Sequence, residues 1–309
     1  MKELNLQQGT QEWLEWRRCG VTATEAAAIM DMSEWATPLS TFLAKRKPAN
    51  SSAPRTAVQE WGSRIEGLLR QKFAENHPEF KVEPGNCFEQ DWQRASLDGT
   101  ATTESGERYI VECKTGRSAD KWTGEIADVP KGYYAQVQWQ MLVSGMRRTY
   151  FAVLINGFEY FERVVEFDEA FAAKMYQVCQ TFWLNYLNGI RPPVSKVHPE
   201  IDQPLLSSLA SEQTDKEAPL EVEPALYEQY STARAELEAA TVRYGAIKAE
   251  LTELLAKHEY LLHDGKKFAS IVKMKPRESV DTAKLKRDYP EVYEAVKKLG
   301  AGTCYPKFG

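Results

Sequence analysis

Three residues have the types and spacing of a metal-dependent hydrolytic site: Asp98 in the segment SLDGT, and Glu112 and Lys114 in YIVECKTG. Because side chains alternate along a strand, Glu112 and Lys114 project from one face, and Cys113 points to the opposite face, into the core. Unpaired charges are rarely buried, so an acid and a lysine on an apolar strand need a partner. A shared Mg²⁺ meets that need, with Asp98 and Glu112 as oxygen ligands and the backbone carbonyl of Cys113 as a further ligand.

Such a site fits the hydrolysis of a phosphodiester. A bound metal lowers the pKa of its water and neutralises phosphate oxygens, and Lys114 is placed to orient the water or to stabilise developing charge. The alternative is a plain ion pair of Glu112 with Lys114 or a neighbour, since E-x-K triplets are common. Two features favour the metal site: Asp98 lies in an S-x-D-G turn fourteen residues upstream of Glu112, and an apolar run precedes Glu112.

The elements that must position these residues are predicted to be alternating helices and strands. Apolar residues at spacings of three and four predict helices over 11–31 with a break at Gly20, 38–47, 56–76, 133–143 and 167–186. Short apolar runs predict strands over 80–82, 87–88, 94–98 and 108–114. We expect the last two strands to form a hairpin around 104–106, and Asn156-Gly157 predicts another between 148–155 and 158–165. Residues 48–54 are typical of a loop.

The C-terminal third has a different pattern. Residues 197–223 show little periodicity and are interpreted as a linker. Beyond them, Tyr230 and Ala233 each begin a series of apolar residues seven apart, which is the a/d repeat of a coiled coil. This repeat fits an antiparallel hairpin within the chain or a coiled coil between chains. Asp264-Gly265 predicts a hairpin, and a last helix is expected over 282–299 behind Asp281 as N-cap.

Composition limits the class of protein and the kind of metal. The five cysteines are scattered singly and the chain has only four histidines, so a structural zinc site is not expected. If a metal binds, we expect a hard cation held by carboxylates. The net charge of −5 is only weak evidence against a nucleic-acid partner. A groove that binds nucleic acid needs only local basic residues. No signal peptide or membrane span is evident, which predicts a cytoplasmic protein of a bacterium or a phage-infected host.

Five ordered segments resemble a known family. The segments are RRCGVTATE (17–25), WGSRIE (61–66), SLDG (96–99), VECK (111–114) and YYAQVQWQM (133–141). In this order they are similar to the YqaJ-like viral recombinase (lambda exonuclease) family, which belongs to the PD-(D/E)xK nuclease superfamily. The resemblance covers residues 8–190. It implies an α/β fold with a restriction-endonuclease-like central mixed sheet flanked by helices.

The resemblance also implies catalytic roles. Asp98 and Glu112 would be metal ligands and Lys114 the catalytic lysine. Glu66, from the W-G-x-x-x-E helix, would join the acidic cluster as a second-metal ligand or as a group that orients water. Gln136, in the A-Q-V-Q helix, would contact the active site. Taken without the resemblance, Glu66 fits a solvated residue at the edge of its helix face, and Gln136 fits a polar helix face.

Three further residues are implied to bind substrate: Arg18, Thr24 and Tyr133. Arg18 and Thr24 match an arginine and a serine that hold the 5′-phosphate in the family. One residue fewer separates the pair here, and threonine replaces serine. An arginine with a hydroxyl is a sound phosphate-binding pair. Without the resemblance, Arg18 fits an ion pair with a nearby glutamate, and Tyr133 fits a core residue.

The sequence thus predicts three parts: an exonuclease domain over 1–196, a linker over 197–223 and a helical, coiled-coil-like C-terminal region of unknown role over 224–309. The function expected from the resemblance is a Mg²⁺-dependent 5′-to-3′ exonuclease on double-stranded DNA ends, with Mn²⁺ as a substitute metal. The product would be 3′ single strands for recombination. Family members form rings, so a homo-oligomer, a trimer by resemblance, is expected, with a single-strand annealing protein as a further partner. The alternatives are a structure-specific endonuclease and a catalytically silent DNA-binding module.

Overall fold

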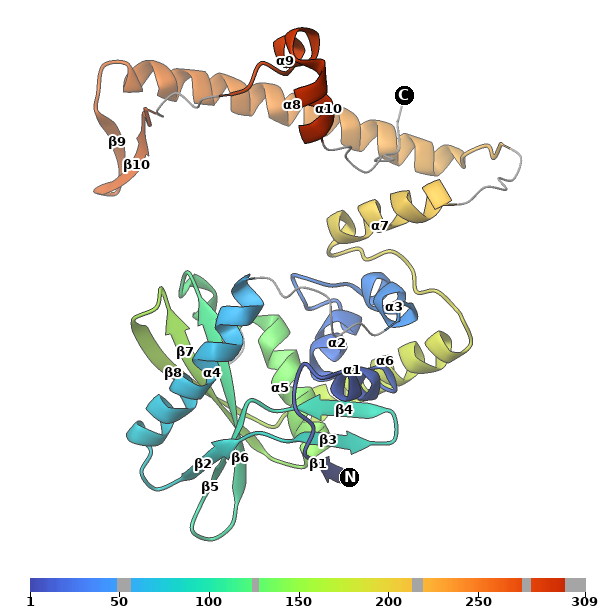
Figure 1. Ribbon diagram of the computed structural model, residues 1–309, viewed down its shortest axis with the longest axis vertical. Coiled ribbons are helices and arrows are strands. Elements are labelled where there is room, and N and C mark those ends of the chain that lie inside the picture. The colour runs from blue at the N-terminus through green and yellow to red at the C-terminus, as the bar shows by residue number, and fades with distance from the viewer. Residues whose placement is uncertain (49–56, 124–127, 213–218, 274–278, 298–309) are drawn as a thin grey trace. The chain divides into compact units, whose positions relative to one another are not determined.

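The computed structural model describes residues 1–48, 57–123, 128–212, 219–273 and 279–297. The described residues divide into two units, and unit 1 ends at Glu212 whereas unit 2 lies within 213–303. The predicted loop at 48–54 lies outside the described residues except for Pro48. Each unit is described by itself (Figure 1).

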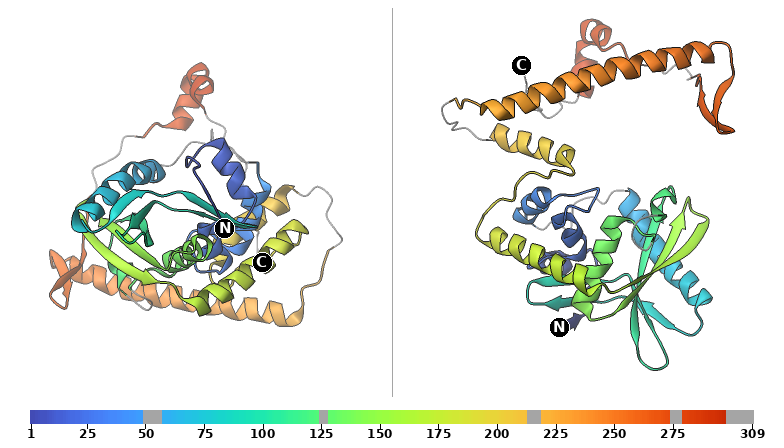
Figure 2. Two further views of the ribbon diagram at one scale, coloured as in Figure 1. Left: turned by 90° about the horizontal axis from the view of Figure 1, so that it is seen from below. Right: turned by 180° about the vertical axis from the view of Figure 1, so that it is seen from behind.

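The centre of unit 1 is a five-stranded sheet in the order β2-β5-β6-β7-β8. Its strands are β2 (Lys81–Pro84), β5 (Gly99–Thr102), β6 (Arg108–Gly116), β7 (Arg148–Ile155) and β8 (Glu159–Glu166). The β6–β7 pair is parallel and the other three pairs are antiparallel, so the sheet is mixed. Helices cover both of its faces (Figure 2). The predicted α/β fold with a central mixed sheet flanked by helices is confirmed.

A second, three-stranded sheet lies beside the first in the order β1-β3-β4. It consists of β1 (Lys2–Leu4), β3 (Cys87–Gln90) and β4 (Gln93–Ser96). The predicted hairpin around 104–106 forms and its second strand is β6, but the prediction of 94–98 as its first strand is wrong, because β5 takes that place. The chain leaves β4 at Ser96, turns through Leu97 and Asp98, and enters β5, which is the strand that pairs with β6. This corner could not be predicted from the sequence, because the apolar pattern continues from β4 through Leu97 without a break.

The helices of unit 1 follow the predicted periodicity, except for the last of them. They are α1 (Gln11–Arg18), α2 (Ala23–Ile29), α3 (Pro38–Arg46), α4 (Ala57–Asn76), α5 (Lys131–Ser144), α6 (Glu169–Leu187) and α7 (Pro199–Glu212), with a 3₁₀ turn at Asp120–Trp122. Polar side chains begin several of them: Thr10, Thr37 and Asp168 accept hydrogen bonds from backbone N–H groups of the first turns of α1, α3 and α6. Gly145 ends α5 with φ of 75°.

The two faces of the main sheet carry separate apolar clusters. Val111 and Cys113 of β6 point to the α4 side, with Leu69 and Phe73 of that helix. Ile110 points to the other side, into the larger cluster with α5. The alternation along β6 thus places Glu112, between Val111 and Cys113, on the α5 side of the sheet.

The predicted linker over 197–223 is wrong in its first half, where α7 forms. Asp202 of this helix is fully buried. Its carboxylate accepts hydrogen bonds from the Thr37 hydroxyl and from the Ser195 backbone N–H, the latter at 2.8 Å. A polar helix was hard to recognise from sequence because its anchor is one buried carboxylate whose partner is 165 residues away along the chain.

Unit 2 consists of a long helix, a hairpin and two short helices. They are α8 (Pro224–Leu255), β9 (Tyr260–His263), β10 (Lys266–Ser270), α9 (Thr282–Asp288) and α10 (Pro290–Val296). The hairpin at Asp264-Gly265 is confirmed, with φ of 49° and 72° at the turn. The single helix predicted over 282–299 is wrong: it divides at Tyr289, before Pro290, whose ring cannot continue a helix.

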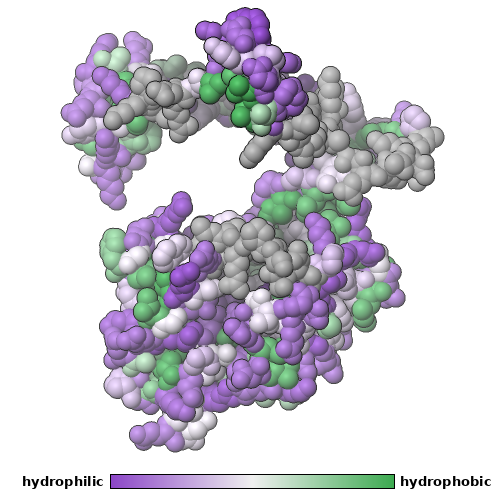
Figure 3. Space-filling model, viewed as in Figure 1, coloured by the Kyte–Doolittle hydropathy of each residue, from purple (hydrophilic) through white to green (hydrophobic). Residues whose placement is uncertain are grey.

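The heptad residues of α8 lie on an exposed helix. None of its residues is buried, and Leu237 and Ile247 are 68% and 51% exposed. On the face in Figure 3, apolar side chains of unit 2 lie at the surface among polar ones. No helix in the described ranges has the length and apolar content that crossing a bilayer requires.

Candidate active site

Asp98 is held at the corner between the two sheets. Its backbone carbonyl accepts hydrogen bonds from Arg70 of α4 at 2.8 Å and from the Gly85 N–H at 3.2 Å. Its carboxylate accepts the backbone N–H of Cys113 at 3.0 Å. Position 85 requires glycine, because a Cβ there would lie 2.3 Å from the Leu97 carbonyl oxygen. These contacts fix Asp98 against β6, the strand that carries Glu112.

Glu112 is the centre of a buried hydrogen-bond network. Its side chain is 1% exposed. One oxygen, Oε1, accepts from Lys114 Nζ and from Gln136 Nε2, each at 2.6 Å. The other oxygen, Oε2, accepts from Gln140 Nε2 at 2.9 Å. Lys114 also donates to Gln136 Oε1 at 3.3 Å. The expectation that Glu112 and Lys114 share one face is confirmed.

The electrostatics of the site leave carboxylate charge to be neutralised. Burial raises the pKa of Asp98 well above its ordinary value, and the carboxylates of Glu112 and Glu66 raise it further against the opposing effect of Lys114. Burial by itself lowers the pKa of Lys114, but Glu112 and Asp98 outweigh it, so this pKa lies above its ordinary value and the ammonium stays charged. One lysine faces several acids, which is a suitable environment for a divalent cation.

The chemistry of the donors fits a hard cation held by few protein ligands. Within the described ranges, no three histidine, cysteine, aspartate or glutamate side chains form a ligand cluster for one ion. Glu66 lies on α4, where its backbone carbonyl accepts a hydrogen bond from Cys113 Sγ at 3.7 Å and its carboxylate acts on Asp98. Mg²⁺ often takes only one or two carboxylates and keeps several waters. Asp98 and Glu112 match that requirement.

Gln136 and Tyr133 lie beside the lysine, on the first two turns of α5. Lys114 Nζ lies 4.7 Å from the centroid of the Tyr133 ring, which in turn packs on Trp122. Contact with a cation over an aromatic face stabilises the charged form of the lysine. Both residues singled out on this helix therefore touch Lys114.

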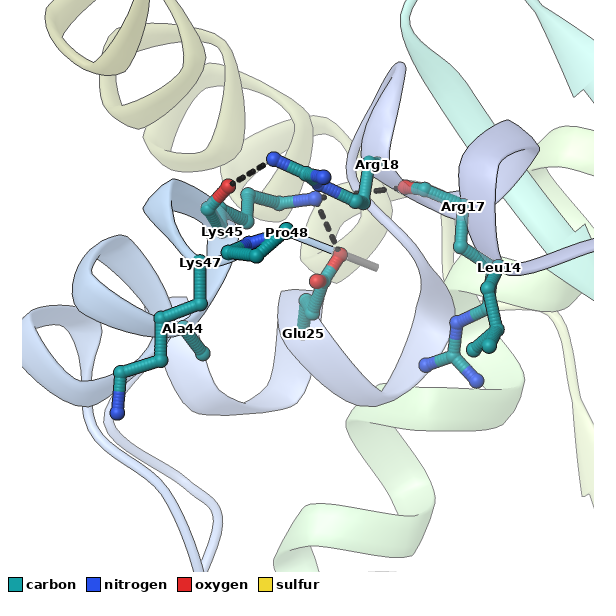
Figure 4. Close-up of a pocket in the computed structure, with 8 residues that line it drawn as sticks. All are labelled: Leu14, Arg17, Arg18, Glu25, Ala44, Lys45, Lys47 and Pro48. Atoms are coloured by element: carbon teal, nitrogen blue, oxygen red, sulfur yellow. Dashed lines mark hydrogen bonds and ion pairs between the residues drawn. The ribbon is translucent and has the colours of Figure 1, made fainter. Parts of the chain in front are cut away.

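Arg18 lines a pocket between α1, α2 and α3, whereas Thr24 is not one of the residues that line it. The pocket has a volume of about 180 Å³ and is lined by Leu14, Arg17, Arg18, Glu25, Ala44, Lys45, Lys47 and Pro48 (Figure 4). Arg18 donates to the Lys45 carbonyl at 3.1 Å. The hydroxyl of Thr24 accepts from Arg17, at 3.3 Å, and the guanidinium of Arg17 points to a different side from that of Arg18.

Several residues of both sites were missed from the sequence. Arg70 lies four residues after Glu66, and Gln140 lies four after Gln136. Residues four apart share a helix face, so this spacing was the available signal. Lys45 gave a misleading one: it sits in a basic run typical of a solvated helix end, yet its side chain is 2% exposed and pairs with Glu25 at 3.1 Å.

The chain is similar to proteins of one family. Residues 12–147 match the YqaJ-like viral recombinase domain. The uncharacterized protein YqaJ of Bacillus subtilis (strain 168) is 25% identical over 312 residues, which cover 99% of this chain and 95% of the relative. An alkaline exonuclease from Laribacter hongkongensis has 18% identity and a TM-score of 0.47, covering 66% of this chain and 99% of its own. A phage-related exonuclease from Haemophilus somnus 129PT has 10% identity and a TM-score of 0.42, covering 55% and 95%.

Proposed function

We propose that the chain, whose residues 12–147 match the YqaJ-like viral recombinase domain, is a Mg²⁺-dependent deoxyribonuclease. The observation that carries the proposal is the network in which Glu112, buried beside Asp98, shares Lys114 with Gln136. A buried ion pair alone has no need of a second carboxylate that remains incompletely neutralised. Asp98, Glu112 and the Cys113 carbonyl would hold the metal, and Mn²⁺ would replace Mg²⁺.

We propose a distinct role in hydrolysis for each residue of the site. When bound, the metal would lower the pKa of a water and neutralise phosphate oxygens. Lys114, kept protonated by the carboxylates around it, would orient the attacking water or offset the charge that develops on the phosphate. Gln136 and Tyr133 would hold the lysine in place, and Glu66 would act through its field on Asp98.

The finer proposal is a 5′-to-3′ exonuclease on double-stranded DNA ends that leaves 3′ single strands. Its support is the pocket between α1, α2 and α3, where four basic side chains outnumber the single carboxylate of Glu25. Arg18 and Thr24 are proposed to bind the 5′-phosphate, and the contact of Thr24 with Arg17 adds Arg17 to that group. An end-binding pocket of this charge would favour a phosphorylated terminus.

The test uses Mg²⁺ with linear duplexes that carry a 5′-phosphate or a 5′-hydroxyl and a label at either end. We expect Mg²⁺-dependent release of nucleotides from the 5′ end, and faster release from the phosphorylated duplex. Lys114→Ala should lose cleavage and keep DNA binding, whereas Lys72→Ala, a half-exposed lysine of α4, should cleave normally. Arg18→Ala should mainly erase the preference for a 5′-phosphate.

The outcomes separate the alternatives. Cleavage of closed circles would replace the exonuclease by an endonuclease with the same site. Absence of Mg²⁺-dependent cleavage would leave a silent DNA-binding module. We also propose a homo-oligomer, a trimeric ring, with a single-strand annealing protein as partner. The mass of the native protein in solution tests the proposed oligomer, and a monomeric mass would contradict it.

A further inference from the structure

Gln140 contacts both segments that carry the two proposed ligands. It is 1% exposed and lies one helical turn after Gln136 on α5. Its amide nitrogen donates to Glu112 Oε2 at 2.9 Å and to the Ser96 carbonyl at 3.2 Å. Ser96 is the last residue of β4, two residues before Asp98, whereas Glu112 lies in β6 of the other sheet. One side chain therefore bridges the two sheets at the site.

The orientation of this amide is fixed by its partners. Both hydrogens of Nε2 are directed at oxygens that only accept, and a flipped amide would place Oε1 against the Glu112 carboxylate and the Ser96 carbonyl. The oxygen Oε1 of Gln140 is buried and has no hydrogen-bond partner among the described residues. A buried acceptor that has no hydrogen-bond partner destabilises the folded state. The side chain thus satisfies both hydrogens of Nε2 and leaves Oε1 without a partner among the described residues.

The two oxygens of Glu112 are held differently. Oε1 accepts a hydrogen bond from Lys114, whose side chain is 17% exposed. Among the described residues, Oε2 accepts a hydrogen bond only from Gln140. Removal of Gln140 would leave Glu112 Oε2 without this donor and would remove the hydrogen-bonded link between β4 and the carboxylate. Lys114 and Gln136, which both contact Oε1, do not replace that contact.

We propose that Gln140 is a positioning residue, which fixes the Glu112 carboxylate and the Asp98 corner in register for a divalent cation. The proposal rests on the proposed metal-dependent function. Groups that orient metal ligands from behind commonly contribute about 10–100-fold to metal affinity or activity. Gln140 acts through Glu112 and through the Ser96 backbone, and it has no role on the substrate itself.

Gln138 provides a matched control on the same helix. It is 0% exposed, and it also makes two hydrogen bonds. Its amide donates to the Glu166 carbonyl at 2.8 Å and its oxygen accepts from the Asp168 N–H at 2.9 Å, so it holds the connection between β8 and α6. Loss of either glutamine amide removes a buried hydrogen-bond pair, but only Gln140 touches the site.

The experiment compares Gln140→Met with Gln138→Met in the full chain. Mn²⁺ binding is measured by calorimetry and by the rise in melting temperature that Mn²⁺ produces, and cleavage is titrated with Mg²⁺. We expect Gln140→Met to weaken Mn²⁺ binding by about 10–100-fold and to raise the half-saturating Mg²⁺ concentration by a similar factor. Gln138→Met should lower the melting temperature without metal and leave the Mn²⁺ affinity unchanged.

Equal Mn²⁺ affinities in the two variants would overturn the role of Gln140 and leave the nuclease proposal intact. A native protein that neither binds Mn²⁺ nor cleaves DNA would overturn both. If Gln140→Met does not give a cooperative melt, Gln140→Asn keeps a donor on a shorter side chain, with Gln138→Asn as its control. The same difference in Mn²⁺ affinity is then expected, smaller in size, and its absence would overturn the proposal.

Discussion

Units 1 and 2 use regular helices in opposite ways. Helix α5 of unit 1 is buried on nearly all sides, and its polar residues Gln136, Gln138 and Gln140 each have specific partners. Helix α8 of unit 2 is longer and has a regular heptad repeat, yet none of its residues is buried. A repeat specifies a helix and the face it would bury, whereas only tertiary contacts specify what each residue does.

The largest expected difference comes from matched truncations in the two helices. Trp139 of α5 is fully buried, packs on Trp92 and donates to the Arg94 carbonyl at 3.1 Å. Trp139→Ala should cost about 3–5 kcal/mol of unfolding free energy, because it leaves a cavity and an unpaired carbonyl. Leu237→Ala, in α8, should change it by less than about 0.5 kcal/mol. Denaturant unfolding followed by circular dichroism and fluorescence measures both.

Leu237 also tests whether α8 is exposed in solution, as the contrast with α5 requires. If Leu237→Ala costs about 2 kcal/mol or more, the value expected of a buried leucine, the heptad face of α8 is covered in solution. A concentration-dependent melting temperature would then show that another chain covers it.

A smaller effect is expected where unit 1 ends. Asp202→Ala in α7 leaves the Thr37 hydroxyl and the Ser195 N–H without their buried acceptor, at a cost of about 1–3 kcal/mol. Asp281 of unit 2 caps α9 by accepting the Lys284 N–H, and Asp281→Ala should cost about 1 kcal/mol or less. Thermal unfolding monitors both variants. An unchanged melting temperature for Asp202→Ala would show that α7 is the linker that the sequence suggested.

These cases show which parts of the molecule the sequence could predict. Helix periods, the Asn156-Gly157 turn and the shared face of Glu112 and Lys114 depend on neighbours within a few residues, and the structure confirms them. The corner at Asp98 depends on which strand pairs with β6, and the burial of Asp202 depends on a distant threonine. Such choices rest on contacts between remote segments, which a local pattern does not contain.

The histidines of the two units should differ in their effect on stability with pH. Burial alone lowers the pKa of His77, but its hydrogen bonds to Glu162 and Glu79 raise it above its ordinary 6.5. Burial likewise raises the pKa of Glu162, and the bond to His77 at 2.7 Å lowers it below 4.5. The contribution of His77 is present below pH 6.5 and is lost as pH rises through its raised pKa. That of Glu162 is present above pH 4.5 and is lost as pH falls through its lowered pKa.

The pair therefore stabilises unit 1 most between these two values. His77→Gln should cost about 0.5–1 kcal/mol near pH 5.5 and less near pH 9. His263 of unit 2 has a side chain that is 80% exposed and pairs with Asp264 at the hairpin turn, so His263→Gln should leave the unfolding free energy unchanged. Urea unfolding at the two pH values measures the difference. A cost for His77→Gln that does not vary with pH would assign its role to packing against Phe73 rather than to charge.

The last pair of effects has opposite signs and tests the backbone alone. Gly245 lies within the exposed α8, where an added Cβ meets no other atoms within 4 Å. Gly245→Ala should therefore stabilise unit 2 by about 0.5–1 kcal/mol, since alanine loses less backbone entropy in a helix. Gly145 ends α5 at φ of 75°, and its N–H donates to the Met141 carbonyl. Gly145→Ala should destabilise unit 1 by about 1 kcal/mol, because a left-handed conformation strains any residue with a Cβ. If Gly245→Ala also destabilised the protein, a close partner would have to occupy the surface of α8 around position 245, and the contrast between the two units would then reflect a missing neighbour rather than an intrinsic property of unit 2.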